Sequence, residues 1–246
     1  MGDFSSCLLG AVLAGGGSSR FGKDKTRAGL GGAPLVARAR NTLAKSFEEV
    51  VVALARDAAA ADVRGLPTAR SAIVHDRRSG RGPMAGIEAA LLEAEKRGRS
   101  GAFVLACDLP LVTPATVEEL VKIWKQEEAP AVAAKLNLRH LEGEERGRLP
   151  SIQPLCAVYS CTLLGALDTA LSGVVPSMHS FFSAVGGRPV QLTEAGDDEF
   201  LNVNTQADLD RAEAVVAGRS GLGGEAFNAT PEPGSGNVRH DKLGTP

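Results

Sequence analysis

The sequence lacks the features that would assign it to a membrane protein, a secreted protein or a general nucleic-acid binder. It has no apolar stretch near the roughly 20 residues that cross a bilayer, and its amino-terminal MGDFSS has neither the basic start nor the apolar core of a secretion signal. It has no excess of positive charge, because 27 Lys and Arg residues face 29 Asp and Glu residues and give a formal net charge of −2. We therefore expect a cytoplasmic protein that binds neither membranes nor nucleic acid.

Paired cysteines are also missing. None of the four cysteines, Cys7, Cys107, Cys156 and Cys161, lies in the C-x-x-C spacing of a zinc site or a thioredoxin-like motif. Cys107 and Cys156 lie in apolar runs, where a thiol behaves as a small hydrophobic side chain. The pattern favours structural cysteines in a reducing compartment.

Length and composition predict one folded domain followed by a tail. With 246 residues, 43 % of them hydrophobic and 23 % charged, the chain can bury one substantial core. We expect this domain to cover residues 1–217. Residues 218–246 contain ten glycines and prolines in 29 residues and few apolar anchors, so we expect a disordered tail there.

The most informative stretch is residues 8–25, where an apolar run ends at three glycines and continues into a positively charged loop. The run Leu8 to Ala14 is short and bounded by glycine, which predicts a strand buried on both faces. The glycines at 15–17 allow the backbone to turn and bring N–H groups close to an anion. Positive charges follow at Arg20, Lys23, Lys25 and Arg27. Such a loop is suited to hold a polyphosphate.

Two common phosphate-binding loops do not fit this stretch. A P-loop requires Ser or Thr directly after its lysine to hold magnesium, but Asp24 follows Lys23. The dinucleotide-binding fingerprint requires glycine or alanine at its sixth position, where this chain has Arg20. The glycine loop therefore belongs to neither of these two classes.

Downstream of this loop, strand-like and helix-like patterns alternate, which predicts an α/β fold with a Rossmann-like, three-layer, doubly wound and mostly parallel sheet. Strands are predicted at residues 8–14, 49–55, 72–75, 102–107, 129–134 and 155–159. Helices are predicted from Pro34 to Leu43, near 57–64, at 86–96 and at 114–126. The charged segment 136–149 is predicted to be a solvated loop or hairpin near the ligand site.

Two aspartates follow predicted strands and are candidates for a site, because ligands of open α/β sheets collect at the carboxyl ends of the strands. Asp108 follows the run AFVLAC, and the residues alone leave open a metal ligand or a turn aspartate ahead of Pro110. Asp76 follows a shorter strand and precedes the segment GPMAG, which begins at Gly82. For Asp76 the residues alone favour a solvated loop acid.

The stretch LAGGGSSRFGKDK resembles the signature loop of the MobA-like molybdenum cofactor guanylyltransferases, which is written roughly LAGGxSxRxGxDK in that nucleotidyltransferase family. The agreement covers Leu13, Ala14, Gly15, Gly16, Ser18, Arg20, Gly22, Asp24 and Lys25. The resemblance implies a nucleotidyltransferase-type fold and a loop that wraps a triphosphate. It also implies that Lys25 binds the triphosphate and that Arg20 contributes positive charge during the reaction.

Two further segments continue the resemblance in the same order along the chain. CDLP at 107–110 matches the family motif C-D-x-P, which implies that Asp108 binds both the nucleotide and magnesium. Asp76 and the GPMAG segment from Gly82 match an acidic residue and a GPLAG segment, which implies that both contact the nucleotide.

The resemblance also assigns an acceptor side. The strand that carries Gln153 resembles the family's HPT- or QPL-type strand, and FLNVNTQADL resembles its closing FxNVNTxxDL motif. Gln153, Asn202 and Asn204 are therefore expected to face the acceptor. Independently of the family, Thr205 is a good helix N-cap, and Asp208 three residues later completes a near capping box.

By this resemblance the chain is expected to transfer GMP from GTP to the terminal phosphate of Mo-molybdopterin with Mg²⁺ as cofactor. Its expected protein partners deliver molybdopterin or act as chaperones of molybdoenzymes. Alternatives are a cytidylyltransferase acting on the same pterin, a sugar-phosphate or alditol-phosphate nucleotidyltransferase, and a non-catalytic pterin-binding protein. The loop reads LAGG rather than LAAG, which favours GTP, although Ala53 stands where guanylyltransferases often have asparagine.

Overall fold

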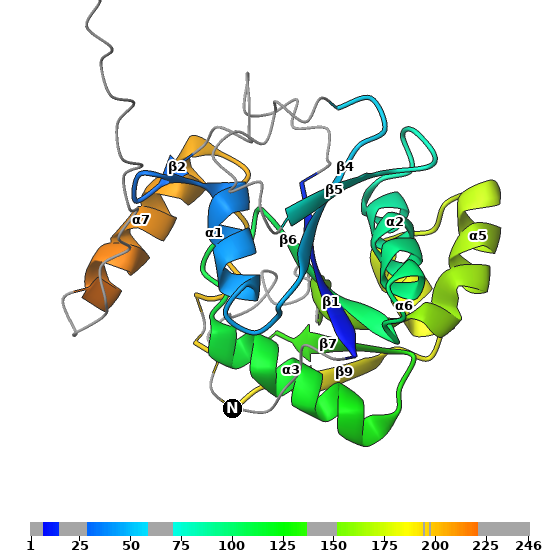
Figure 1. The fold of residues 1–246 in the computed structure, drawn as a ribbon. Coiled ribbons are helices and arrows are strands. Elements are labelled where there is room, and N and C mark those ends of the chain that lie inside the picture. The colour runs from blue at the N-terminus through cyan, green and yellow to red at the C-terminus, as the bar shows by residue number, and fades with distance from the viewer. Residues whose placement is uncertain are drawn as a thin grey trace, which may run out of the picture.

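A seven-stranded sheet forms the centre of the computed structural model, and helices cover both of its faces (Figure 1). The structure describes residues 7–14, 29–58, 71–136, 152–193, 195–196 and 198–220. The strands of this sheet are β1 (Leu8–Leu13), β4 (Val50–Leu54), β5 (Ser71–His75), β6 (Gly101–Ala106), β7 (Ala131–Lys135), β8 (Ile152–Ser160) and β9 (Arg188–Gln191). Their order across the sheet is β5-β4-β1-β6-β8-β7-β9.

The direction of the strands confirms a doubly wound, mostly parallel sheet. β1 pairs in parallel with both β4 and β6, β4 pairs in parallel with β5, and β7 pairs in parallel with β9. β8 is antiparallel to both of its neighbours, β6 and β7. Its reversal brings the amino end of β8 to the edge of the sheet where the parallel strands end.

Two apolar clusters fill the space between the sheet and its helices. On one face, α1 (Leu35–Leu43) and α3 (Pro114–Glu127) pack side chains such as Leu43 and Leu120 against the sheet. On the other face, α2 (Pro83–Lys96), α5 (Leu164–Ser172) and α6 (Met178–Ala184) pack residues such as Leu91 and Phe182. Since β1, β4 and β6 are buried along their whole length, they need apolar residues on both faces.

A smaller third cluster joins the carboxyl-terminal helix α7 (Gln206–Ser220) to the hairpin of β2 (Gly29–Leu30) and β3 (Ala33–Pro34). Its buried members are Leu30, Leu35, Leu111, Val203, Leu209 and Ala212. These residues come from three regions that are far apart in the sequence, residues 30–35, Leu111 and residues 203–212. The cluster therefore fixes α7 next to the start of α1 (Figure 1).

The predicted elements that fall on described residues are present, with shifts of up to three residues at their ends. The predicted helix near 57–64 lies mostly outside the described residues, and Asp57 itself is in a turn. The segment 136–149 also lies outside them, apart from its first residue. α7 extends to Ser220, past the predicted domain boundary at 217, and residues 221–246 are not described. The strand β9 and the helices α5 and α6 were not predicted.

No helix in the described part of the chain has both the length and the apolar character needed to cross a membrane. The four cysteines, all of which are described, form no disulfide bond. Burial raises the pKa of the Cys156 thiol far above its usual range, and the nearby Glu199 adds to the effect. Cys156 is therefore a core residue, as its apolar surroundings in the sequence predicted.

Candidate functional site

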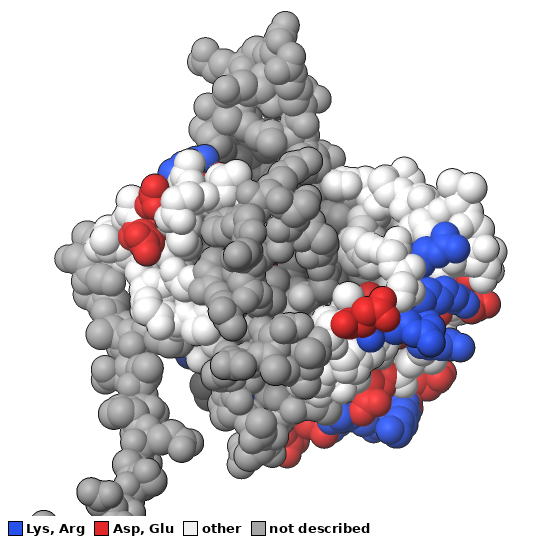
Figure 2. All heavy atoms as spheres, turned by 90° about the horizontal axis from the view of Figure 1, so that it is seen from above, with Lys and Arg blue, Asp and Glu red and all other residues white. Residues whose placement is uncertain are grey.

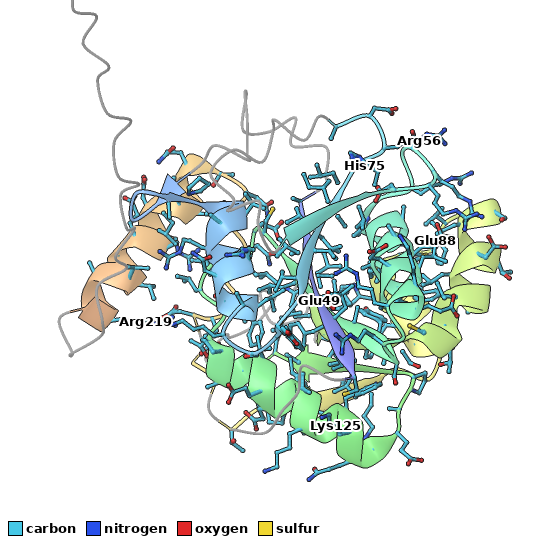
Figure 3. All side chains as sticks on the ribbon, viewed as in Figure 1. Glu49, Arg56, His75, Glu88, Lys125 and Arg219 are labelled. Atoms are coloured by element: carbon cyan, nitrogen blue, oxygen red, sulfur yellow. The ribbon has the colours of Figure 1, made fainter. Side chains whose placement is uncertain are left out.

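The carboxyl ends of four parallel strands form the edge of the sheet that carries the candidate site. Main-chain hydrogen bonds join the residues that follow them: Ala14 N–H donates to Ala53 (2.9 Å), and Cys107 N–H donates to Leu13 (3.0 Å). In Figure 3, Arg56 and His75 lie at this edge, at the top of the view, whereas Glu49, which precedes β4, lies below. The chain therefore leaves β1, β4, β5 and β6 on the same side of the molecule.

Asp108 stands at this edge in the turn that follows β6, and its side chain is partly buried. Its main-chain oxygen accepts a hydrogen bond from the N–H of Val203 at 2.9 Å. Val203 is fully buried, while its neighbours Asn202 and Asn204 are exposed. The structure thus brings the predicted metal ligand and the two predicted acceptor-side asparagines together, although about 95 residues of chain separate them.

Gln153 lies at the same edge because β8 runs antiparallel to β6. It pairs with Ala134 at the point where the register between β7 and β8 shifts. Its side chain is only 6 % exposed, and its Oε1 accepts a hydrogen bond from the N–H of Leu155 at 3.3 Å. The amide of Gln153 is therefore held against its own strand, and its predicted acceptor-side role stays a prediction.

The first turn of α2 packs closely against the ends of β1 and β4. A Cβ atom at Gly86 would lie 3.0 Å from Leu13 Cδ2, 3.6 Å from Asp76 Oδ1 and 3.7 Å from Ala53 Cβ. Gly82, the residue before α2, has φ +66°, a conformation that favours glycine. The two glycines of GPMAG thus have separate roles, since Gly82 makes the turn and Gly86 leaves room for the packing.

Partial burial raises the pKa of the Asp76 carboxyl to about 6; the nearby Glu88 adds to this effect, and His75 acts against it. Because the raised value means that the folded protein favours the protonated form, ionised Asp76 opposes folding above about pH 6. This cost shrinks as the pH falls through 6 and vanishes below the pKa of the unfolded chain, near 4.

We expect Asp76→Asn to unfold at a higher temperature than the wild type at pH 7.5, because asparagine carries no charge that must be buried. The difference should shrink steadily between pH 6 and pH 4, as Asp76 itself becomes protonated. Thermal unfolding of both proteins over this pH range measures it. If the difference in unfolding temperature were the same at pH 4 and at pH 7.5, the raised pKa would not belong to Asp76.

A network of arginines fixes the loop between Asp76 and Gly82. Arg78 donates to Glu88 Oε1 of α2 at 3.0 Å and also pairs with Asp168 of α5. Arg81 donates to the main-chain oxygen of Gly173 at 3.0 Å. Figure 2, seen from above the carboxyl edge, shows Lys and Arg side chains gathered among Asp and Glu on the side of α2 and α5. This network could not be predicted from the sequence, because its partners lie up to 92 residues apart.

The helix start predicted at Thr205 is confirmed. Asp208 Oδ2 accepts hydrogen bonds from the N–H of Asn204 (3.0 Å) and from both N–H and hydroxyl of Thr205 (2.9 Å each). Partial burial works against ionisation of Asp208, but these hydrogen bonds outweigh it, so the pKa of this carboxyl is lowered. Thr205 and Asp208 therefore cap α7 and fix the end of the asparagine segment.

Eight of the predicted site residues lie at this one edge: Leu13, Ala14, Asp76, Gly82, Asp108, Gln153, Asn202 and Asn204. The other four, Gly15, Gly16, Arg20 and Lys25, lie outside the described residues, so their placement stays a prediction. Within the described ranges no three His, Cys, Asp or Glu residues form a group that could hold a metal ion. Glu199, which contacts the helix after Asp108, was not singled out from the sequence.

Comparisons with known proteins agree on the class of fold and of activity. Residues 10–184 match the model of the MobA-like NTP transferase domain. A probable molybdenum cofactor guanylyltransferase of Opitutus terrae is 32 % identical over 211 residues, which cover 84 % of this chain and 95 % of that protein. A molybdenum cofactor guanylyltransferase of Acidiphilium cryptum is 33 % identical over 217 residues, which cover 87 % and 98 %.

Solved structures share the fold. Molybdopterin-guanine dinucleotide biosynthesis protein A from Archaeoglobus fulgidus superposes with a TM-score of 0.68 at 24 % identity, covering 86 % of this chain and all of that one. A 4-diphosphocytidyl-2C-methyl-D-erythritol synthase from Anaerococcus prevotii gives a TM-score of 0.60 at 13 % identity, covering 86 % and 99 %. Both solved structures thus share the fold of this chain, although the two proteins are named for different products.

Proposed function

Since this chain belongs to the MobA-like NTP transferase family and is a nucleotidyltransferase, we propose that it transfers GMP from GTP to the terminal phosphate of Mo-molybdopterin. The products are molybdopterin guanine dinucleotide and pyrophosphate. The observation that carries the proposal is that Asp76, Asp108 and the Asn202–Asn204 segment lie at the same edge of the sheet, where β1 leads into the signature loop.

The reaction joins two phosphate groups and requires no covalent enzyme intermediate. An oxygen of the pterin phosphate attacks the α-phosphorus of GTP, the bond from this phosphorus to the bridging oxygen breaks, and pyrophosphate leaves with the electron pair. A phosphate monoester is already an anion at neutral pH, so no general base is needed. Catalysis then rests on holding the two anions in line and on neutralising their charge.

The residues present fit a bound Mg²⁺ ion. Magnesium prefers oxygen ligands and is usually bound by one or two carboxylates together with waters and substrate phosphates. Asp108 offers such a carboxylate at the carboxyl edge of the sheet, so we assign the metal to it. When bound, Mg²⁺ would neutralise part of the charge on the triphosphate.

We assign the triphosphate to the signature loop, with Leu13, Ala14, Gly15 and Gly16 as its backbone contacts and with Lys25 and Arg20 as its cations. Leu13 and Ala14 support this assignment because both are held at the site edge by main-chain hydrogen bonds. Lys25 and Arg20 are assigned by their match to the family motif. Gln153, Asn202 and Asn204 complete the site on the acceptor side.

We expect Lys25→Ala to weaken binding of a non-hydrolysable GTP analogue by about 10- to 100-fold, because one charge-assisted contact to phosphate is lost. Calorimetric titration in Mg²⁺ measures the dissociation constant. Lys45→Ala is the matched control, since Lys45 is an exposed lysine beyond the far end of α1. An unchanged dissociation constant in Lys25→Ala would remove this lysine from the triphosphate site.

A cytidylyltransferase acting on the same pterin is the second candidate, and Ala53 favours it. Ala53 is 2 % exposed and packs beside the first turn of α2. Its methyl group offers no hydrogen bond to a base, whereas asparagine at this position in guanylyltransferases would. Comparing GTP with CTP as substrate separates the two candidates.

The proposal extends to the cellular setting. We propose molybdopterin-delivering proteins and molybdoenzyme chaperones as partners, because the proposed substrate must be supplied to this protein and the proposed product passed on. We propose that the reaction takes place in the cytoplasm. The four cysteines form no disulfide bond, which agrees with a reducing compartment. Co-purification with a molybdopterin-producing enzyme tests the first of these assignments.

A further inference from the structure

Glu199 is a buried carboxylate in the segment that leads to the asparagines. Its side chain is 3 % exposed. Its Oε2 accepts hydrogen bonds from the Thr116 hydroxyl at 2.6 Å and from the Thr113 N–H at 3.1 Å. The Thr113 hydroxyl lies 3.2 Å from Oε1 and 3.3 Å from Oε2. The carboxylate is thus well satisfied by polar groups, which offsets the cost of removing its charge from water.

All of these donors belong to the start of α3. Thr113 is the N-cap of this helix, and its own hydroxyl accepts from the N–H of Thr116 at 3.3 Å. A negative charge is favoured at a helix N-terminus, because the first N–H groups of the helix point toward it. α3 begins six residues after Asp108, so Glu199 is attached to the segment that carries the predicted metal ligand.

A second attachment follows four residues later in the chain. The N–H of Val203 donates to the main-chain oxygen of Asp108 at 2.9 Å, and the Val203 side chain is buried beside Leu111 in the third cluster. The chain is therefore fixed to the segment 108–116 at two points, Glu199 and Val203. Asn202 lies between these points and Asn204 directly after them, and both are exposed.

We propose that Glu199 is a positioning residue that holds the asparagine segment in register with Asp108. An apolar side chain would fill the same space at a lower cost of burial, but it would offer no directional bond to Thr113 or Thr116. The buried carboxylate fixes where the segment crosses the start of α3, and hence which residue meets Asp108. This inference rests on the proposed function, because that function gives Asp108 and the asparagines their roles.

Glu199→Gln tests the proposal, because the amide keeps the size of the side chain but loses the charge and turns one acceptor into a donor. We expect a KM for molybdopterin about 10-fold higher and a higher half-saturating Mg²⁺ concentration, as one charge-assisted contact is lost. Binding of a GTP analogue without Mg²⁺ should stay within about twofold, since the hydrogen bonds of Glu199 go to the start of α3 rather than to the strand β1 that leads into the signature loop. A purely structural role would lower thermal stability and leave both of these kinetic values unchanged.

Glu119→Gln is the matched control. Glu119 also lies on α3 and also accepts a backbone N–H (3.0 Å) and a hydroxyl (2.8 Å), but from Thr193, which follows β9 and precedes the stretch 199–204 that Glu199 and Val203 attach to the segment of Asp108. Thr116→Val is a milder second variant, because it removes only the hydroxyl that donates at 2.6 Å. We expect it to shift the KM for molybdopterin in the same direction and by less.

Hydrogen exchange of the Val203 amide gives a readout that needs no reaction. We expect faster exchange in Glu199→Gln than in the wild type and in Glu119→Gln. Unchanged exchange at Val203, or a wild-type KM in an active Glu199→Gln enzyme, overturns the proposal. A wild-type enzyme that forms no dinucleotide overturns the proposed function instead, and the exchange rates then still decide whether Glu199 holds the segment.

Discussion

Asp108→Asn is expected to lower the rate of nucleotidyl transfer by about 10²- to 10³-fold, the range seen when one electrostatic contact to a transition state is removed. Asparagine keeps the size of the side chain but replaces a charged oxygen ligand with a neutral one. The contact that joins Asp108 to Val203 uses the main-chain oxygen, which the substitution retains. The variant should therefore fold and still bind the nucleotide, with its loss concentrated in turnover.

Release of pyrophosphate over a range of Mg²⁺ concentrations measures this effect. Asp210→Asn is the control, since Asp210 is an exposed aspartate on α7 whose carboxylate accepts from the side chain of Gln206. We expect the control to match the wild type at every Mg²⁺ concentration. Wild-type turnover of Asp108→Asn at limiting Mg²⁺ would show that another group holds the metal.

Gly101→Ala is expected to be the most destabilising small substitution in the sheet. Gly101 begins β6 and pairs with Ser160 of β8. A Cβ atom at this position would lie 2.3 Å from the main-chain oxygen of Tyr159, a distance that forces the backbone of β8 to move. We expect a loss of about 3 kcal/mol or more in the free energy of unfolding, at the upper end of the cost of overpacking.

Urea unfolding of the wild type and two variants tests this expectation. Gly165→Ala is the control, because a Cβ atom at Gly165 on α5 would meet no atom within 4 Å apart from its chain neighbours and the backbone of its own helix. We expect this control to gain about 0.5 kcal/mol, since alanine is the better helix former. If Gly101→Ala unfolds at the same urea concentration as the wild type, β6 and β8 do not pack as closely as the structure shows.

The sequence predicted the central strands because their burial dictates their composition. β1, β4 and β6 are covered by helices on both faces, so each appears as a short, continuous apolar run. The same property hides the direction of β8, since a strand buried on both faces has no alternation to show how it pairs. The shift in register between β7 and β8 likewise depends on contacts between distant residues.

Short elements at the margin of the fold were not predicted. β9 has four residues and includes Pro189, which weakens any strand pattern. α6 has only seven residues, too few for a helical period to stand out. Tertiary packing against the sheet stabilises both elements, and a local pattern does not contain that information.

The candidate site also contains residues that sequence motifs predicted and residues that only the structure shows. Asp76, Asp108 and the asparagines were predicted as site residues because they match family motifs, and the structure places them at one edge of the sheet. Glu199 was missed because the run of acids in GDDEF has the pattern of a solvated loop, and only the structure shows the burial of Glu199 at the start of α3. The arginine network around Glu88 was missed for the same reason.

The central claim is tested most directly by identifying the product of the reaction. The purified protein is incubated with Mg²⁺ and metal-loaded molybdopterin, with GTP and CTP in separate reactions, and the pterin product is identified by mass. The account predicts the guanine dinucleotide with GTP and release of pyrophosphate. A cytosine dinucleotide would keep the chemistry and change the base, whereas no dinucleotide with either nucleotide, from folded protein that binds the pterin, would contradict the account.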